Sequence, residues 1–275
     1  MGLRVGAVSY LNAKPLYHRL AEFAPNVQLT LDYPSILADL LERGELDVAL
    51  IPSIEYLQGA ERGYEILPGF AIAAHGPVRS VKLFSRVPFR KIRRLALDEG
   101  SRTSHALCRI WLAKKHGVFP NFLEILPMGV PAEESTADAV MLIGDRAMRD
   151  PAGDFVEFVD LAEAWNEMTG LPFVFALWVT REGVDLGDLP DRLALSKADG
   201  LAHAEELATA NAARLGLDRV SCIDYLTRVL SYDLGAREIA GLRRFAMEAA
   251  ALGLAPRGAD LVFHNDRRFD LAQGR

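Results

Sequence analysis

The sequence predicts an α/β protein made of two similar lobes with a ligand cleft between them. Strands alternate with helices of about ten residues, a pattern typical of parallel sheets with crossover helices. Residues 2–16 and 93–107 repeat one design, in which an apolar strand leads through a small polar turn into a helix. Residues 47–53 and 138–145 form a second repeated pair, in which an acidic residue precedes an apolar strand that ends in a polar turn.

The first lobe begins with alternating strands and helices. The pattern predicts strands over 3–9, 27–33 and 47–51 and helices over 13–23 and 35–44. The strands are nearly continuous in apolar residues, which indicates a sheet covered on both faces. Extended segments over 64–74 and 78–85 follow.

A change of region is predicted at Val87-Pro88-Phe89, which precedes a cluster of basic residues. We place the first crossing between the lobes there. The second lobe is then expected to contain strands and helices at the following positions: strands 95–97, 122–126 and 139–143, and helices 102–116 and 160–169.

The rest of the chain is expected to return to the first lobe. Residues 171–180 are typical of a long buried strand, and the segments after it show helical spacing with no further strand, over 201–215, 221–231 and 236–252. Lobe one therefore comprises 1–87 and 175–275, with a helical C-terminal tail packed on it, and lobe two comprises 88–174. Two crossings of this kind form a hinge.

Composition narrows the class of protein. The 275 residues include 31 basic and 37 acidic side chains, for a net charge of −6, which argues against non-specific attraction to nucleic acid or an anionic membrane. Cys108 and Cys222 lie among apolar helical residues without metal-ligand spacing, so we expect buried thiols. With neither an export signal nor a membrane-spanning apolar run, we expect a cytoplasmic protein.

Candidate ligand-binding residues follow the first strand of each lobe. A helix start leaves backbone N–H groups unpaired at the positive end of the helix dipole, so two facing helix starts would hold an anion. Asn12 is either an ordinary N-cap or a site residue, and the residues alone do not decide. Ser101, Thr103 and Ser104 provide three hydroxyls at one helix start, which is more than capping of the helix requires. We therefore favour a carboxylate cradle made by Thr103, Ser104 and backbone N–H groups.

Other polar residues leave alternatives open. Ser80 is either a plain strand serine or reaches the cleft, and Asp145 either caps a short helix or faces the cleft. Arg102 is a carboxylate clamp, or it faces solvent, or it pairs with Asp98 or Glu99, so we leave it out of the site. The six histidines are scattered, and we expect no metal. The chain has no GxGxxG, GxxxxGK[ST] or GxSxG motif, which removes support for those nucleotide-binding loops and for serine-hydrolase chemistry.

Several strings in order resemble chorismate dehydratase, the menaquinone-biosynthesis family of the futalosine route. The resemblance spans residues 3 to 180 and rests on VSYLNAKPL (8–16), DVALIPSIEY (47–56), GPVRSVKLFS (76–85), ALDEGSRTSHALCRI (96–110), DAVMLIGDRAM (138–148) and TGLPFVFALW (169–178). It implies the fold of type II periplasmic binding proteins. It also implies a lyase that dehydrates chorismate to 3-[(1-carboxyvinyl)oxy]benzoate without a metal or organic cofactor.

The resemblance implies a role for each candidate. Asn12 would face the reacting ring as the catalytic residue, and the substrate-binding residues would be Ser80, Ser101, Thr103, Ser104 and Asp145. Because dehydration makes the ring of this small dianion aromatic, the protein mainly has to orient it. No general base is evident in the motifs, which suggests that the substrate's side-chain carboxylate accepts the proton.

Two other functions remain alternatives. The same fold serves modules that bind or sense small anions, and a related enzyme of the same pathway makes a dihydroxynaphthoate. The missing export signal and helix-turn-helix segment weaken the first, and the SRTS turn with GPVRSVKLFS weakens the second. No oligomeric state follows from the sequence.

Overall fold

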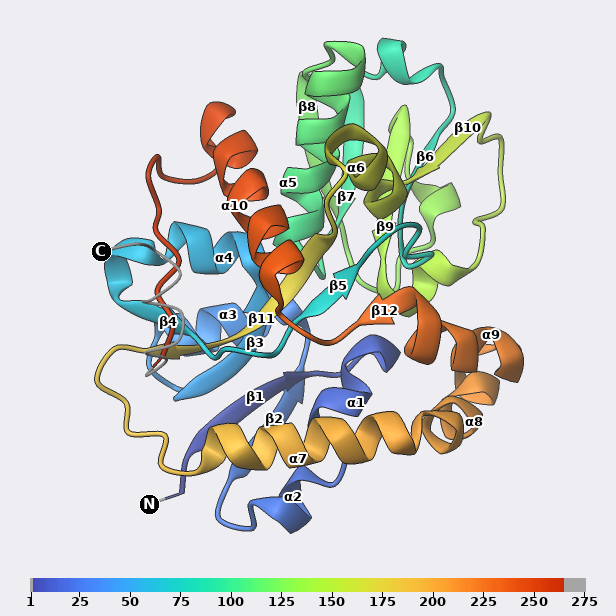
Figure 1. Ribbon diagram of the computed structural model, residues 1–275. Helices are drawn as coiled ribbons and strands as arrows, with labels where there is room; N and C mark the ends of the chain where they lie inside the picture. The colour runs from blue at the N-terminus through green and yellow to red at the C-terminus, as the bar shows by residue number, and fades with distance from the viewer. Residues whose placement is uncertain (1, 265–275) are drawn as a thin grey trace.

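The computed structural model describes residues 2–264, which form two lobes that each contain one mixed β-sheet with helices packed on it (Figure 1). The sheet of lobe one has the strand order β12-β5-β11-β3-β1-β2, with β4 paired to β11. The sheet of lobe two has the order β10-β6-β9-β7-β8. The predicted two-lobed α/β architecture is therefore confirmed.

The strands of lobe one come from three separate parts of the chain. They are β1 (Arg4–Val8), β2 (Gln28–Asp32), β3 (Val48–Pro52), β4 (Tyr64–Ile66), β5 (Ile72–Ala74), β11 (Phe173–Arg181) and β12 (Leu230–Ser231). Its helices before the first crossing are a 3-10 turn over Leu11–Ala13, α1 (Lys14–Tyr17), α2 (Leu20–Phe23), α3 (Pro34–Glu42) and α4 (Ser53–Gln58). Strand β3 is buried along its whole length, as its apolar sequence predicts.

Lobe two is built from one continuous stretch. Its strands are β6 (Val81–Ser85), β7 (Arg94–Asp98), β8 (Phe122–Leu126), β9 (Ala139–Ile143) and β10 (Glu157–Asp160). Its main helices are α5 (Arg102–Trp111), which continues as a π-helical turn to His116, and α6 (Leu161–Thr169).

The two sheets repeat one topology down to their register. In lobe one, β1 lies parallel to β2 and β3; in lobe two, β7 lies parallel to β8 and β9. The acidic residues before β3 and β9 also correspond. Asp47 accepts a hydrogen bond from the Arg4 N–H at 2.8 Å, and Asp138 accepts one from the Arg94 N–H at 2.9 Å. The repeated pattern seen in the sequence is thus an internal structural repeat.

The crossings between lobes differ from their predicted positions. Strand β6 pairs antiparallel with β9 and β10 of lobe two, so the first crossing lies between β5 and β6, ahead of the predicted boundary at residue 87. The second crossing lies between β10 and β11, because Phe173 already pairs with β5 of lobe one. The predicted boundary after residue 174 falls inside β11. The apolar sequence of a strand does not indicate which of the two sheets the strand joins. This explains why the first crossing was predicted at the wrong position.

Two local predictions were wrong. The helix expected over 13–23 is interrupted at Arg19, whose φ of 51° lies in the left-handed region, and it forms α1 and α2. The tail contains a strand that was not expected, because Leu230 and Ser231 pair with β5. Both free cysteines, Cys108 and Cys222, are buried as predicted.

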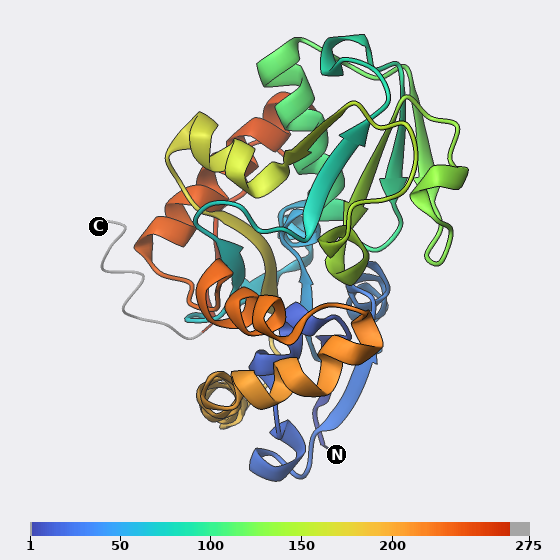
Figure 2. The ribbon, with the colours of Figure 1, turned by 90° about the vertical axis from the view of Figure 1, so that its right-hand side faces the viewer.

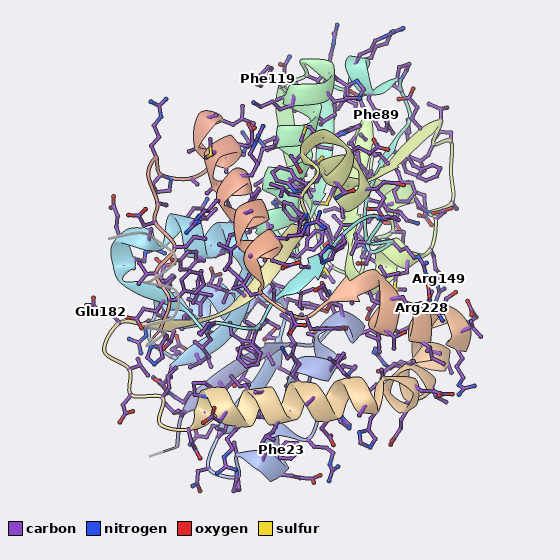
Figure 3. All side chains as sticks on the ribbon, in the orientation of Figure 1. Phe23, Phe89, Phe119, Arg149, Glu182 and Arg228 are labelled. Atoms are coloured by element: carbon purple, nitrogen blue, oxygen red, sulfur yellow. The ribbon has the colours of Figure 1, made fainter. Side chains whose placement is uncertain are left out.

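The C-terminal tail contacts both lobes. Its helices are α7 (Leu189–Ala202), α8 (Ala204–Leu215), α9 (Arg219–Asp224) with a π-helical continuation over Tyr225–Val229, and α10 (Ala236–Ala251). Helix α7 packs on α1, and α10 packs both on β11 of lobe one and on α5 of lobe two (Figures 1 and 2). Arg149 of lobe two donates to the carbonyl oxygen of Leu215 at the end of α8 (Figure 3). None of the helices within residues 2–264 is long and apolar enough to cross a membrane.

Candidate active site

A cavity lies between the lobes, where the strand ends of the two repeats face each other. It encloses about 500 Å³, including its open mouth. Asn12, Ser80, Ser101 and Ser104 all line it, so the structure brings four of the six predicted site residues together. The remaining wall is mainly apolar, for example Val8, Pro52, Val78, Ile143 and Phe175. A mostly apolar cavity with a few convergent polar groups is typical of a small-molecule site.

Asn12 is a cavity residue and does not cap its helix. It lies in the 3-10 turn that follows β1, and the residue at the cap position, Tyr10, makes no side-chain capping bond. The Asn12 Oδ1 atom is buried and has no hydrogen-bond partner within the part of the chain that the structure describes. The N-cap alternative is therefore wrong, and an unpaired buried acceptor at a cavity wall requires a ligand or water to satisfy it.

Asp145, which belongs to lobe two, caps this turn of lobe one. Its Oδ1 accepts a hydrogen bond from the Leu11 N–H at 3.3 Å. Burial raises the pKa of the Asp145 carboxyl, while the Leu11 N–H, Arg214 and Lys14 act in the opposite direction. Asp145 is not among the residues that line the cavity. In place of the expected substrate contact, the side chain joins the lobes.

Thr103 of lobe two makes a similar contact with a different helix start of lobe one. It is fully buried, and its Oγ1 accepts a hydrogen bond from the Ile54 N–H, in the first turn of α4, at 3.1 Å. It does not line the cavity either. The predicted place of Thr103 in the carboxylate cradle gains no support from this geometry, because the side chain does not line the cavity and its oxygen serves a helix start of lobe one. Asp145 and Thr103, both in lobe two, thus each satisfy one of the N–H groups that a helix start of lobe one leaves unpaired.

Ser101 and Ser104 form the hydroxyl pair at the start of α5. Ser101 caps the helix, since its Oγ accepts from the Ser104 N–H at 3.4 Å, and the two Oγ atoms lie 3.2 Å apart. Both side chains also line the cavity. The two alternatives for Ser101 are therefore compatible, and the pair stands at the positive end of a ten-residue helix.

Ser80 belongs to a network that sequence reasoning missed. Its Oγ accepts a hydrogen bond from the Tyr225 hydroxyl at 2.7 Å, and the Asn12 side chain is a second polar neighbour that lowers the pKa of the same hydroxyl. Burial raises the pKa of Tyr225 well above its usual value, so this hydroxyl keeps its proton. Tyr225 opens the π-helical turn after α9, and such turns occur often at functional sites. The sequence showed only helical spacing there.

The Tyr10 side chain limits how closely the two lobes can approach each other. It lines the cavity from lobe one, and its ring faces two glycines of lobe two. A Cβ atom at Gly100 would lie 2.5 Å from the Tyr10 hydroxyl oxygen, and one at Gly144 would lie 3.1 Å from the ring. The glycines of the EGS and IGD turns therefore leave room for this side chain.

Arg102 reaches across to lobe one. Its Nη1 lies 2.8 Å from an Asp39 carboxylate oxygen and 3.2 Å from the nearly buried Glu55 carboxylate. Burial raises the pKa of Glu55, and Arg102 opposes that shift. The Arg102 side chain is 40% exposed and does not line the cavity, and its ion-pair partners among the described residues are Asp39 and Glu55, so the predicted pair with Asp98 or Glu99 is wrong. Arg102 is a third contact that holds the lobes together.

The cavity offers neutral groups only. None of the described residues that line it carries a charge, and none is a histidine or a cysteine. Its polar groups are the amide of Asn12 and the hydroxyls of Tyr10, Ser80, Ser101 and Ser104. Such groups stabilise an anion as preorganised dipoles in a site poor in water. This donor set does not suit a metal ion.

Comparison with known proteins places the chain in a family. Residues 3–251 match the family model described as menaquinone biosynthesis. The chain belongs to this menaquinone biosynthesis family. Chorismate dehydratase of Thermus thermophilus is 34% identical, over 92% of this chain and 96% of that protein. Chorismate dehydratase of Campylobacter jejuni is 26% identical, over 91% of this chain and 99% of that protein.

Two further similarities concern the alternative functions, a naphthoate synthase and a small-anion-binding module. The 1,4-dihydroxy-6-naphtoate synthase of Thermus thermophilus is 26% identical, over 77% of this chain and 79% of that protein. The alkanesulfonate-binding protein SsuA of Xanthomonas axonopodis pv. citri superposes with a TM-score of 0.62 at 17% identity, over 93% of this chain and 94% of that one. The structural likeness confirms the periplasmic-binding-protein-like fold of this family member.

Proposed function

We propose that the protein is a chorismate dehydratase, a lyase that converts chorismate to 3-[(1-carboxyvinyl)oxy]benzoate in menaquinone biosynthesis. The observation that carries this proposal is the 34% identity to chorismate dehydratase of Thermus thermophilus over nearly the whole of both chains. The similarity to the naphtoate synthase is lower and covers less of each chain. Membership of a biosynthetic family also supports a cytoplasmic location.

The hydrogen-bond network gives Asn12 a defined orientation for this chemistry. Its Oδ1 has no partner, so the amide nitrogen is the group that meets the Tyr225 hydroxyl. Tyr225 in turn donates to Ser80. The Asn12 Oδ1 is then directed at the substrate as an acceptor for the ring hydroxyl, and the Ser80 hydrogen is left to donate to a substrate carboxylate.

The other wall of the cavity supplies the anion site. Ser101 and Ser104 present hydroxyls at the start of α5, where the helix dipole favours a negative group. We place a substrate carboxylate there. Thr103, Asp145 and Arg102 act indirectly, since their cross-lobe contacts hold the site closed and exclude water.

The proton acceptor is assigned to the substrate. The reaction removes the ring hydroxyl and a neighbouring ring hydrogen as water, and the ring becomes aromatic. Because no carboxylate or imidazole of the described residues lines the cavity, the side-chain carboxylate of chorismate is the remaining base. The protein contributes orientation and anion stabilisation, with no metal or organic cofactor.

The decisive experiment is to incubate the purified protein with chorismate and to follow the products by liquid chromatography with mass spectrometry. We expect the aromatic enol ether, and turnover should survive treatment with a chelator and dialysis. Saturable binding of chorismate without product would favour the anion-binding module. Turnover of a larger cyclic substrate alone would favour the naphthoate synthase. Activity that is lost with the chelator and restored by metal would refute the assigned site.

A further inference from the structure

A cluster of two histidines and one aspartate lies outside the cleft, where α1 meets α7. His18 directly follows α1 at the break before Arg19, and Asp199 and His203 lie one helical turn apart at the end of α7. The helices meet closely at Gly200, where a Cβ atom would lie 2.2 Å from the Pro15 carbonyl oxygen. This close packing brings His18 onto the face that carries Asp199 and His203.

The geometry of the cluster resembles that of a three-ligand metal site. One nitrogen of each imidazole and one carboxylate oxygen all lie within 4.8 Å of one another. His18 Nε2 is 3.7 Å from Asp199 Oδ2, and the His203 ring lies beside the same carboxylate, with its Nδ1 atom 3.5 Å from Asp199 Oδ1 and its Nε2 atom left for a metal ion. Metal–ligand bonds of about 2.0–2.2 Å place neighbouring ligand atoms roughly 3–3.5 Å apart, so modest side-chain rotations suffice.

Two further observations concern the ligand atoms themselves. The Asp199 Oδ2 atom is buried and has no hydrogen-bond partner within residues 2–264. His203 Nδ1 lies 2.8 Å from the backbone carbonyl oxygen of Asp199. A ring N–H donated to a backbone carbonyl leaves the other ring nitrogen, Nε2, with a free lone pair, which is the usual arrangement behind a metal-bound imidazole.

We propose that His18, Asp199 and His203 bind a divalent transition-metal ion of the zinc class. Two imidazoles and one carboxylate suit zinc, cobalt or nickel, whereas magnesium and calcium prefer oxygen ligands alone. None of the three residues lines the cavity, so the ion has a structural role. It clamps α1, which follows the Asn12 turn, to the C-terminal tail.

Arg19 is the competing cation. Its Nη1 lies 3.4 Å from Asp199 Oδ1, and its guanidinium is also bonded to the exposed Glu22. The Arg19 side chain is 45% exposed, so it is free to leave Asp199 when a metal ion binds. The alternative to the metal site is that Asp199 serves only as the centre of surface ion pairs.

The test is a titration of the tag-free full chain, freed of metal by a chelator, with zinc sulfate and separately with cobalt chloride. We expect one ion per chain by calorimetry and visible d–d absorption bands with cobalt. His18→Ala and His203→Ala should each weaken binding at least about 10-fold. The matched control His75→Ala, a histidine that pairs with Glu238 far from the cluster in sequence, should bind like the parent.

An Arg19→Gln variant separates the two interpretations. Removing the competing cation should tighten zinc binding several-fold if the cluster is a metal site. No saturable binding by the parent, or equal binding by the parent and both histidine variants, would overturn the proposal. Thermal melting without metal shows that each variant is folded. Because the cluster is outside the cleft, dehydratase turnover should not change with zinc, and either proposal can fail independently.

Discussion

The two turns that follow β1 and β7 occupy equivalent places in the internal repeat, yet they present different chemistry to the cavity. After β7 a ten-residue helix starts with its own cap, Ser101, and supplies hydroxyls with the positive end of a dipole. After β1 the helix is broken into short pieces, and its first N–H is capped by Asp145 of the other lobe. Lobe one thereby leaves one amide, Asn12, without a capping task, and in the proposed function this amide meets the reacting groups. The comparison teaches that two copies of one fold can present different polar groups to a shared cavity because their turns are capped differently.

The strongest test of this difference is Asn12→Asp. It keeps the size of the side chain and places a negative charge where a dianion must bind. The loss of the amide nitrogen also removes the interaction with Tyr225 that the proposed orientation of Asn12 requires. We expect turnover to fall about 100-fold or more, as when other preorganised groups are lost, with an unchanged melting temperature. Steady-state kinetics and thermal melting measure both, and Asn121→Asp on the exposed surface is the matched control. Near-normal turnover would remove Asn12 from the catalytic set.

The serine pair of lobe two should affect binding more than turnover. Ser104→Ala removes one donor from the proposed carboxylate site and should weaken substrate affinity by about 1–3 kcal/mol with little change in stability. Ser101→Ala should weaken affinity similarly and also lower the stability by about 1 kcal/mol, because the cap of α5 is lost. Michaelis constants and chemical denaturation distinguish the two. If Ser104→Ala changes only stability, the anion site is not here.

Tyr225→Phe tests whether the tail orients Asn12. The substitution removes one hydroxyl from a buried network and leaves the ring in place. Turnover should fall about 10-fold, because the amide is no longer held in one orientation. The Michaelis constant and melting temperature should change less, and Tyr232→Phe, another buried tyrosine of the tail, is the control. A loss of stability without a kinetic effect would give Tyr225 a purely structural role.

The smallest effect is expected for Asp145→Asn. An amide oxygen still accepts the Leu11 N–H, so the cap is kept. Because burial raises the pKa of Asp145, the folded state holds this proton more tightly than the unfolded state, and stability is lost as the pH rises through that range. The variant should therefore melt about 1–3 °C higher at neutral pH and show no gain in acid, where the carboxyl is protonated in both states. A gain that is the same at every pH would show that ionisation is not the cause.

The sequence predicted the repeat because it depends on local patterns. Apolar strands, polar turns and the acidic residues Asp47 and Asp138 all appear within a few positions of each other. The same local signals selected Asn12, Ser80, Ser101 and Ser104, which all line the cavity. The resemblance to a known family was needed to choose function over capping for Asn12.

Features that depend on distant partners were not predictable in the same way. Thr103 and Asp145 carry the same side chains whether they meet a substrate or a backbone N–H 49 or 134 positions away. The sequence of strand β6 would suit either of the two sheets. Tyr225 contacts Ser80, 145 positions away in the sequence, only when the C-terminal tail folds back. The left-handed conformation of Arg19 was not predictable either, because it lies between two short helices, α1 and α2, that both pack on the distant helix α7.

The contact between Tyr10 and Gly100 has a consequence for the opening of the cleft. The backbone of Gly100 is not among the glycines with positive φ, so its own conformation would accept a side chain. The nearest atom that a Cβ atom there would meet is the Tyr10 hydroxyl oxygen of the other lobe, at 2.5 Å, ahead of Ile143 at 3.1 Å and Asp98 at 3.3 Å in its own lobe. A methyl group at residue 100 would thus act as a wedge between the lobes, because it would meet the Tyr10 hydroxyl before the two turns could approach as closely as they do in this structure.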